Sequence, residues 1–144
     1  MNCVHILLIE DNVGDVLLTT EALKDSSIQN TLSIARDGWE AMQYLEKKDP
    51  FIGARMPDLI LLDVNLPKKN GHEVLINIKT NEKLKHIPVI MLTTSSSPKD
   101  IFKSYYNHAN CYITKPTAGN DFSQLIGAIK KFWIEIAQLP SQIT

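Results

Sequence analysis

The sequence predicts an α/β protein built on a doubly wound, five-stranded parallel sheet, and two observations carry the prediction. The first is the run of four aliphatic residues 59–62, which leads directly into Asp63. A short, continuous apolar run is typical of a strand that is covered on both faces. The second is that strand-like and helix-like segments alternate five times, which requires crossover connections with helices on both faces of the sheet. The strand order 2-1-3-4-5 fits this alternation best.

The first strand and helix lie at the start of the chain. Residues 4–9 are apolar except for one histidine, and they end at Glu10 and Asp11. Apolar side chains at helical spacing in residues 13–23 predict a helix, which Asp11 or Asn12 can cap. Two carboxylates therefore fall at the carboxyl end of the first strand.

The second strand and helix are followed by the central strand. Residues 31–35 alternate between apolar and polar side chains, which favours a strand near an edge of the sheet. Asp37 and Glu40 form a capping pair that opens the second helix, and Pro50 stops it. The third strand is the apolar run 59–62.

Two further units and a last helix complete the alternation. Apolar residues after Gly71 predict a third helix that ends near Asn81. Residues 88–93 form a fourth strand, with proline only at its first position, where it is tolerated. Ser97, followed by proline and an acid, begins a fourth helix. Residues 111–114 form the fifth strand.

The last helix is expected to begin between residues 118 and 121 and to run to about Leu139. About twenty residues span roughly 30 Å, longer than the sheet that the helix covers, so the final turns should overhang with apolar side chains exposed. Because such a patch usually marks an interface, we expect a symmetric homodimer through this helix and the neighbouring fourth-helix and fifth-strand face. The expected interface residues are Phe132, Trp133, Ile134, Ile136 and Leu139. The alternative is a helix that folds back onto the body.

Composition limits the classes of function. A chain of 144 residues is expected to form one domain, residues 1–144, and only four residues follow Pro140, so no output domain is expected. Fifteen basic and sixteen acidic residues, without a long run of one sign, argue against nucleic-acid binding. The first apolar run is too short for a signal peptide or a membrane span. Cys3 and Cys111 lack metal-ligand spacing. Because no export signal is recognised, we expect them to be reduced thiols in a cytoplasmic protein.

The carboxyl ends of the predicted strands carry chemically related side chains. Glu10, Asp11 and Asp63 should meet at one edge of the sheet, where carboxylates repel each other unless a cation lies among them. Oxygen ligands alone favour a hard ion such as Mg²⁺, for which Mn²⁺ or Ca²⁺ could substitute. The alternative is that Glu10 and Asp11 only complement the dipole of the following helix.

Strands four and five add a hydroxyl and an ammonium to this edge. Thr93 and Lys115 supply a donor and a point charge, the groups needed to hold phosphoryl oxygens. A carboxylate flanked by a metal ion, a lysine and a hydroxyl can attack phosphorus and form an aspartyl phosphate. The four histidines are scattered, and we expect structural or surface roles for His5, His72, His86 and His108.

Residues 9–12, 62–71, 92–93 and 112–116 resemble, in order and spacing, the receiver domain of two-component response regulators, which has a flavodoxin-like fold. The resemblance implies that Asp63 accepts a phosphoryl group from a sensor histidine kinase. It also implies Mg²⁺ ligation by Asp11 and Asp63 directly, by Glu10 through water and by the Asn65 carbonyl. Residues 65 and 68–71 are similar to those of stand-alone regulators of bacterial phytochrome kinases.

The resemblance implies further roles near the phosphoacceptor. Thr93 and Tyr112 match the family's switch pair, although Tyr112 could equally serve packing, and Lys115 matches its phosphate-contacting lysine. A cis bond is implied between Lys115 and Pro116. Position 94 is threonine where the family often has a smaller residue, so slow self-dephosphorylation is expected. Asn65 and Ser95 flank the same approach and should also tune the phosphoryl lifetime.

The favoured hypothesis is a regulator in which an unidentified downstream protein recognises the charge state of Asp63. Three other classes of function are less compatible with the sequence. A small phosphatase or phosphotransferase of the haloacid dehalogenase type would carry a second acid where Asn65 stands. A flavodoxin-like cofactor carrier would need a phosphate loop after the first strand, where Glu10 and Asp11 would repel phosphate. A degenerate receiver used only as a scaffold would not keep the acids, Thr93 and Lys115. The phosphoacceptor interpretation is therefore favoured over an enzyme with turnover.

Overall fold

A five-stranded parallel sheet in the order β2-β1-β3-β4-β5 is the framework of the part of the chain that the structure, a computed structural model, describes: residues 3–24 and 29–140. This is the order that the sequence predicts. The strands are β1 (Val4–Ile9), β2 (Asn30–Ala35), β3 (Leu59–Leu62), β4 (Val89–Thr93) and β5 (Cys111–Thr114). The helices are α1 (Val13–Lys24), α2 (Gly38–Leu45), α3 (Gly71–Lys79), α4 (Pro98–Tyr106) and α5 (Gly119–Ile129), with a π-helix η1 (Lys130–Ile136) after α5.

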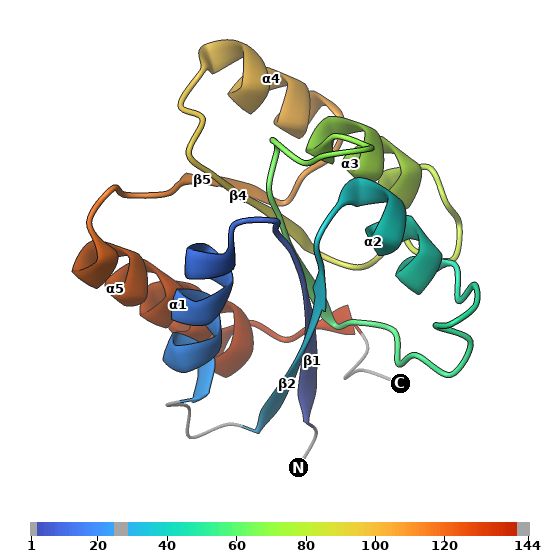
Figure 1. Cartoon of the computed structure of the whole chain (residues 1–144), viewed down its shortest axis with the longest axis horizontal. Helices are drawn as coiled ribbons and strands as arrows, with labels where there is room; N and C mark the ends of the chain where they lie inside the picture. Colours follow the sequence, from blue (N-terminus) through green and yellow to red (C-terminus); the bar gives the residue numbers. More distant parts are fainter. Residues whose placement is uncertain (1–2, 25–28, 141–144) are drawn as a thin grey trace.

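The helices form two layers, one on each face of the sheet. Helices α1 and α5 lie side by side on one face, and α2, α3 and α4 cover the other (Figure 1). Alternate side chains of β1 enter opposite layers, with Leu7 and Ile9 packed in the core of α2 and α3, and Ile6 and Leu8 in the core of α1 and α5. The strand is therefore apolar on both sides, as a doubly covered strand has to be.

Polar side chains cap the first turns of α2, α4 and α3, at the predicted positions Asp37 and Ser97 and also at Asn70, which was not predicted. Asp37 accepts a hydrogen bond from the backbone N–H of Glu40 at the start of α2, at 2.7 Å. Ser97 accepts one from the N–H of Asp100 at the start of α4, at 3.4 Å. Asn70 does the same for Glu73 at the start of α3, at 3.0 Å. Each cap satisfies an N–H that the first helical turn leaves without a partner.

The strand register brings the polar strand ends together. Ile9 pairs with Leu62, so the residues that follow them, Glu10 and Asp63, lie at the same level of neighbouring strands. Thr93 pairs with Thr114 at the other side of β4, one residue before Lys115. The carboxyl edge of the sheet therefore carries these side chains side by side, at the point where the strand order reverses.

The last helix differs from the expected α-helix to Leu139. After α5, the hydrogen bonds of η1 span five residues, as between the Ala137 N–H and the Phe132 carbonyl at 2.7 Å. Because of this wider turn, residues five apart lie on the same side of the helix, and Ile129 and Ile134 are both buried. Leu139, beyond η1, is 1% exposed.

The predicted apolar overhang is therefore wrong for two of its five residues. Ile134 and Leu139 pack in the core under α1 and α5, because the chain folds back onto the body. Phe132 and Ile136 are 53% and 63% exposed, as expected, and Trp133 is partly buried.

The backbone corrects one further expectation. Within the residues that the structure describes, the cis peptide bond lies between Asp49 and Pro50, and the bond between Lys115 and Pro116 is trans. Cys3 and Cys111 are free thiols. No helix in residues 3–24 and 29–140 has both the length and the apolar composition needed to cross a membrane.

Candidate functional site

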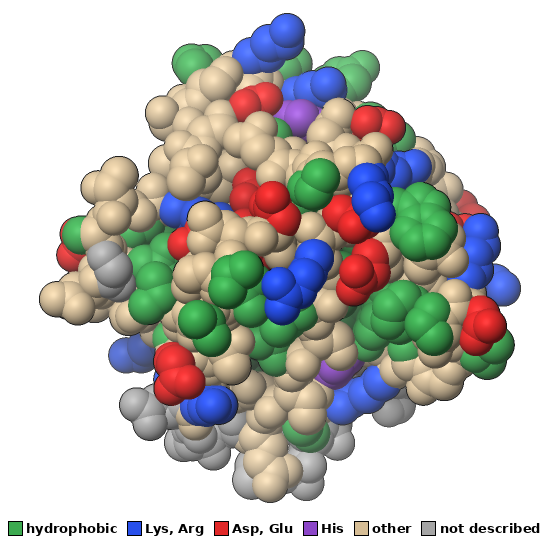
Figure 2. All heavy atoms as spheres, in the orientation of Figure 1, with side chains coloured by type: hydrophobic (Ala, Val, Ile, Leu, Met, Phe, Trp, Pro, Cys, Tyr) green, Lys and Arg blue, Asp and Glu red, His purple; other side chains and the backbone are tan. Residues whose placement is uncertain are grey.

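Acidic side chains gather at the carboxyl ends of β1 and β3. Glu10 and Asp11 follow β1, Asp63 follows β3, and one carboxylate oxygen of each lies within 4.8 Å of the others. Glu10 and Asp63 are buried, whereas Asp11 is exposed. Acidic side chains are seen near the middle of the face in view, with basic side chains around them (Figure 2). This set of hard oxygen donors fits a divalent cation such as Mg²⁺.

Lys115 closes the acid cluster from the end of β5. Its backbone N–H donates to the carbonyl oxygen of Thr93 at 2.7 Å, so the end of β4 fixes where the side chain begins. Its Nζ donates to Glu10, to Asp15 Oδ2 at 2.8 Å and to Asp63 Oδ2 at 3.3 Å. Because the lysine side chain is only 2% exposed, solvent screens these charge pairs weakly.

Burial affects the lysine and its nearest acid differently. Burial raises the pKa of Glu10 to about 7, against the hydrogen bond from Lys115 and together with the nearby charge of Asp63. Burial by itself would lower the pKa of Lys115, but hydrogen bonds to Asp15 and Glu10 and the charge of Asp63 raise it above its ordinary value. The lysine therefore stays positively charged inside the cluster.

The connection between β3 and α3 packs directly against Asp63. The Asp63 N–H donates to the Ile9 carbonyl at 3.1 Å, which extends the β1–β3 ladder by one residue, and the Asn65 N–H donates to Asp63 Oδ1 at 3.2 Å. The Gly71 N–H donates to the Val64 carbonyl at 2.8 Å. A Cβ on Gly71 would overlap the carbonyl oxygen of Asp63, so only glycine fits at this approach.

Thr93 and Tyr112 are linked through Ser95. Thr93 is fully buried, and its Oγ1 accepts a hydrogen bond from the Ser95 N–H at 3.3 Å. The Tyr112 hydroxyl donates to the Ser95 carbonyl at 2.8 Å, and burial raises the pKa of that hydroxyl above its ordinary value. Ser95, which was expected only to tune the phosphoryl lifetime, thus connects the two residues of the expected switch pair, Thr93 and Tyr112.

The structure brings four of the predicted site residues, Glu10, Asp11, Asp63 and Lys115, into one cluster. Asn65 is exposed but touches this cluster through its N–H bond to Asp63, and Thr94 lies exposed directly after Thr93 in the sequence.

The sequence did not single out Asp15, which holds Lys115 from the first turn of α1. An acid in the first turn of the helix after β1 is the signal that could have found it, but such acids are common because they complement the helix dipole.

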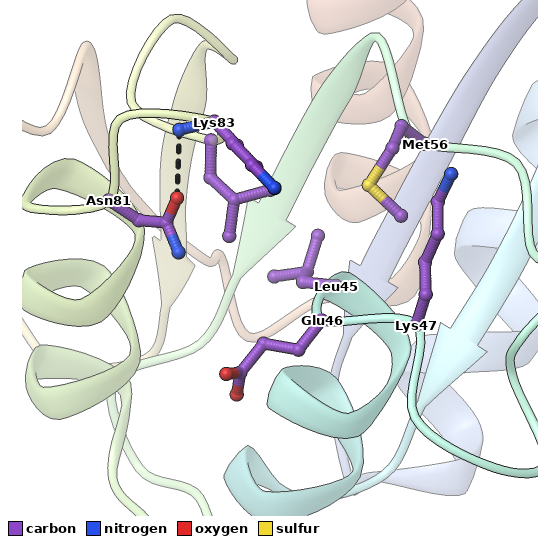
Figure 3. A pocket seen from close by; sticks show the side chains of 7 residues that line it. Leu45, Glu46, Lys47, Met56, Asn81 and Lys83 are labelled. Carbon is purple, nitrogen blue, oxygen red and sulfur yellow. Dashed lines mark hydrogen bonds between the residues drawn. The ribbon is translucent and has the colours of Figure 1, made fainter.

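A hollow of about 400 Å³ lies at the opposite edge of the sheet. It is formed by the end of α2, the segment before β3 and the segment after α3, all at the amino ends of the strands (Figure 3). Glu46 supplies the one carboxylate of its lining, and Lys47 and Lys83 the ammonium groups. It shares no residue with the acid cluster, so it is a separate feature.

Comparison with known proteins gives one family. Residues 6–128 match the response regulator receiver domain. Response regulator Rcp1 of Synechocystis sp. is 46% identical over 136 residues, which cover 94% of this chain and 92% of the relative. The probable methanogenesis regulatory protein FilR2 of Methanothrix harundinacea is 40% identical over 129 residues, 90% of this chain and 83% of the relative.

Solved structures agree with these sequence relatives. The crystal structure of Mn²⁺-bound Rcp1 superposes with a TM-score of 0.92 at 46% identity, covering 94% of this chain and 98% of that one. The crystal structure of the phosphorylated cyanobacterial phytochrome response regulator RcpA gives 0.95 at 47% identity, covering 96% and 99%.

Acids closed in by a buried lysine at the switch point of a 2-1-3-4-5 sheet define a doubly wound α/β domain with a candidate cation site at its carboxyl edge. The chain belongs to the response regulator receiver family of two-component signalling. The predicted fold and family are confirmed.

Proposed function

We propose that Asp63 is the phosphoacceptor of this receiver and takes its phosphoryl group from the phosphohistidine of a sensor histidine kinase. A carboxylate oxygen of Asp63 attacks phosphorus as the P–N bond to the kinase imidazole breaks, and the bonding electron pair returns to that nitrogen. The observation that carries the proposal is the position of Asp63, buried and within 3.3 Å of Lys115 Nζ, inside the acid cluster.

Mg²⁺ is the proposed cofactor, with Mn²⁺ or Ca²⁺ as substitutes. Asp11 and Asp63 would hold it directly, Glu10 through water and Asn65 through its backbone carbonyl. The all-oxygen donor set supports this assignment, and the relative Rcp1 has been crystallised in an Mn²⁺-bound form. Bound Mg²⁺ would offset negative charge on the carboxylates and on phosphoryl oxygens.

Lys115 and Thr93 are the proposed phosphoryl contacts, and Thr93 and Tyr112 the proposed switch. The Lys115 ammonium already lies beside Asp63, where it can pair with an added phosphoryl oxygen. The Thr93 hydroxyl can donate to another oxygen, and its link to Tyr112 through Ser95 would carry the change to the surface. Asn65, Thr94 and Ser95 are proposed to tune the lifetime of the acyl phosphate.

The kinase partner is proposed to be a phytochrome, and the switched surface is proposed to be read by a downstream protein. The relative RcpA, a cyanobacterial phytochrome response regulator that is 47% identical to this chain, supports the choice of a phytochrome. A cytoplasmic location is part of the proposal, supported by the two free thiols, Cys3 and Cys111.

We also propose a homodimer through the exposed apolar side chains of the last helix. Phe132 and Ile136 are exposed, and Phe132 packs edge-on against Trp133 with 5.4 Å between ring centroids. A mostly apolar hollow of about 440 Å³ lies beside them, lined in part by Cys111 and Ile113 of β5. Ile134 and Leu139 are buried and lie outside this surface. A monomeric mass by light scattering at micromolar concentration, with and without phosphorylation, would contradict the dimer.

The residue two positions after Asp63 does not fit a phosphatase that turns over a separate substrate. The phosphatase alternative needs a second acid two residues after the nucleophile, and Asn65 stands there with its N–H donating to Asp63 Oδ1. An amide side chain does not transfer a proton as a carboxyl group does.

Acetyl phosphate with Mg²⁺ tests the proposed function. The wild-type protein should gain the mass of one phosphoryl group, and Asp63→Asn should not. Asp121→Asn, an exposed acid in the first turn of α5, is the matched control and should be phosphorylated like the wild type. Asp11→Asn should bind Mg²⁺ at least about tenfold more weakly by calorimetry, because one proposed ligand is removed. Equal phosphorylation of the wild type and Asp63→Asn would refute the assignment.

A further inference from the structure

A chain of hydrogen bonds runs from helix α3 to the hydroxyl of Thr93. His72, on α3, lies with its Nε2 3.0 Å from Oδ1 of Asp100, in the first turn of α4. The other carboxylate oxygen of Asp100 accepts from Ser95 Oγ at 2.6 Å. Ser95 in turn donates its backbone N–H to Thr93 and accepts a hydrogen bond from Tyr112. None of the phosphoryl chemistry described above uses His72 or Asp100.

The imidazole of His72 forms its hydrogen bond among the described residues with Asp100. The residue is 6% exposed, and its Nδ1 is buried with no hydrogen-bond partner among the described residues. Because a carboxylate can only accept, Nε2 carries the hydrogen of the bond to Asp100. Burying one ring nitrogen without a hydrogen-bond partner is unfavourable. The packing of α3 nevertheless places the ring so that its other nitrogen, Nε2, forms a hydrogen bond to Asp100 of α4.

Asp100 joins three parts of the fold through its two oxygens. The hydrogen bonds from Ser95 and His72 hold the pKa of this carboxyl below its ordinary value, so it accepts as a carboxylate. Asp100 itself belongs to the first turn of α4, where its N–H is capped by Ser97. The start of α4, the middle of the β4–α4 loop and α3 are therefore fixed to one another at this residue.

We propose that His72 and Asp100 are positioning residues for the phosphoryl-dependent switch, acting through Ser95 on the Thr93 hydroxyl. A threonine hydroxyl has one hydrogen to donate and can also accept. When Thr93 accepts from the Ser95 N–H, its own hydrogen is left for a phosphoryl oxygen. His72 and Asp100 hold Ser95 in the place from which it does this. The inference rests on the proposed function of Asp63.

Ser95 and Asp100 also connect a movement of Thr93 to helix α4. Ser95 is hydrogen-bonded to Thr93, to Asp100 and to the Tyr112 hydroxyl. A movement of Thr93 toward a phosphoryl group therefore displaces Ser95 and changes the geometry of its hydrogen bonds to Tyr112 and Asp100. Coupling free energies are reciprocal, so loss of the His72 contact weakens phosphoryl-analogue binding as well as the response of α4.

Calorimetric titration with beryllofluoride in the presence of Mg²⁺ measures this coupling, because beryllofluoride mimics a phosphoryl group on a carboxylate. His72→Leu keeps a buried apolar side chain but removes the donor, and should weaken binding by about fivefold to tenfold. His72→Gln places an N–H donor near the position of Nε2 and should recover most of the affinity. His86→Leu, at an exposed histidine in the loop before β4, is the matched control and should bind as the wild type does.

A double-mutant cycle separates positioning from general structural damage. If His72 acts through Ser95, then His72→Leu should have little further effect on beryllofluoride affinity in a Ser95→Ala background. The affinity for Mg²⁺ alone should be unchanged in His72→Leu, because His72 does not belong to the acid cluster.

Additive effects in the cycle, a parallel loss of Mg²⁺ affinity, or wild-type affinity in His72→Leu would each overturn the inference. If the wild type itself shows no Asp63-dependent binding of beryllofluoride, it is the proposed function that fails.

Discussion

The ammonium of Lys115, after β5, lies 2.8 Å from Oδ2 of Asp15, in the first turn of α1. This contact joins the two ends of the fold across the carboxyl edge of the sheet, and it holds the lysine beside Asp63 before any phosphoryl group arrives. Lysine side chains lose substantial rotamer freedom when they are fixed, so the ion pair with Asp15 pre-organises the charge that phosphorylation needs.

Lys115→Met should destabilise the protein strongly in the absence of divalent cations. The substitution leaves Glu10 and Asp63 buried without their counter-charge, which costs about 3–5 kcal/mol in the free energy of unfolding. Saturating Mg²⁺ should recover part of this loss, because it brings positive charge back to the same carboxylates. Urea unfolding with and without Mg²⁺ measures both effects.

Lys131→Met, at an exposed position in η1, is the control for this substitution. It should change the free energy of unfolding by less than about 0.5 kcal/mol. If Lys115→Met unfolded at the same urea concentration as Lys131→Met, the central role of the buried lysine would be wrong.

Gly71→Ala should displace the backbone of Asp63. The added methyl group would overlap the Asp63 carbonyl oxygen, and overpacking of this kind costs about 1–3 kcal/mol. Beryllofluoride affinity should fall as well, because the carboxylate moves with its backbone. At Gly127 in α5 an added methyl group meets no atom within 4 Å, so Gly127→Ala should instead stabilise the protein by about 0.5–1 kcal/mol. Equal effects of the two substitutions would contradict the close-approach argument.

Thr94→Ala should shorten the lifetime of the phosphorylated protein several-fold. Thr94 is exposed directly after Thr93, where its methyl and hydroxyl groups can narrow the approach of water to the acyl phosphate. The decay of protein phosphorylated with acetyl phosphate, after removal of the donor, gives the lifetime. An unchanged decay rate would show that Thr94 does not shield the phosphoryl group.

His5 should make the protein less stable as the pH falls. Its pKa is lowered from 6.5, first by burial and then by the charge of Arg55, while Asp58 acts in the opposite direction. Its ring nitrogens contact Thr31 and Tyr44. The unfolded chain therefore binds the proton more readily, so the contribution of His5 is complete above the unfolded pKa and decreases below it.

Replacement of His5 isolates this contribution. The pH dependence of the free energy of unfolding between about pH 5 and 7 should be shallower in His5→Gln than in the wild type. The same slope in both proteins would mean that other groups govern this range.

The acid cluster could be predicted because each member follows a strand whose apolar pattern is local in the sequence. Once β1 and β3 are neighbours, their register places Glu10 beside Asp63 without further information. The caps Asp37 and Ser97 were predicted for the same reason, since a capping side chain and the backbone N–H that donates to it lie within one helical turn.

The remaining features depend on contacts between distant segments. His72 and Asp100 are 28 residues apart, and their bond requires the relative placement of α3 and α4, which no local pattern encodes. Ile134 is buried because η1 widens the helical turn, whereas a regular α-helix would have exposed it.

Localisation of the phosphoryl group within the chain tests the central claim most directly. After reaction with acetyl phosphate and Mg²⁺, borohydride reduction converts an aspartyl phosphate to homoserine, which peptide mass spectrometry can locate. Homoserine is expected at position 63 in the wild type and is expected to be absent in Asp63→Asn. Homoserine at Asp11 or another acid, or its persistence in Asp63→Asn, would show that Asp63 is not the phosphoacceptor.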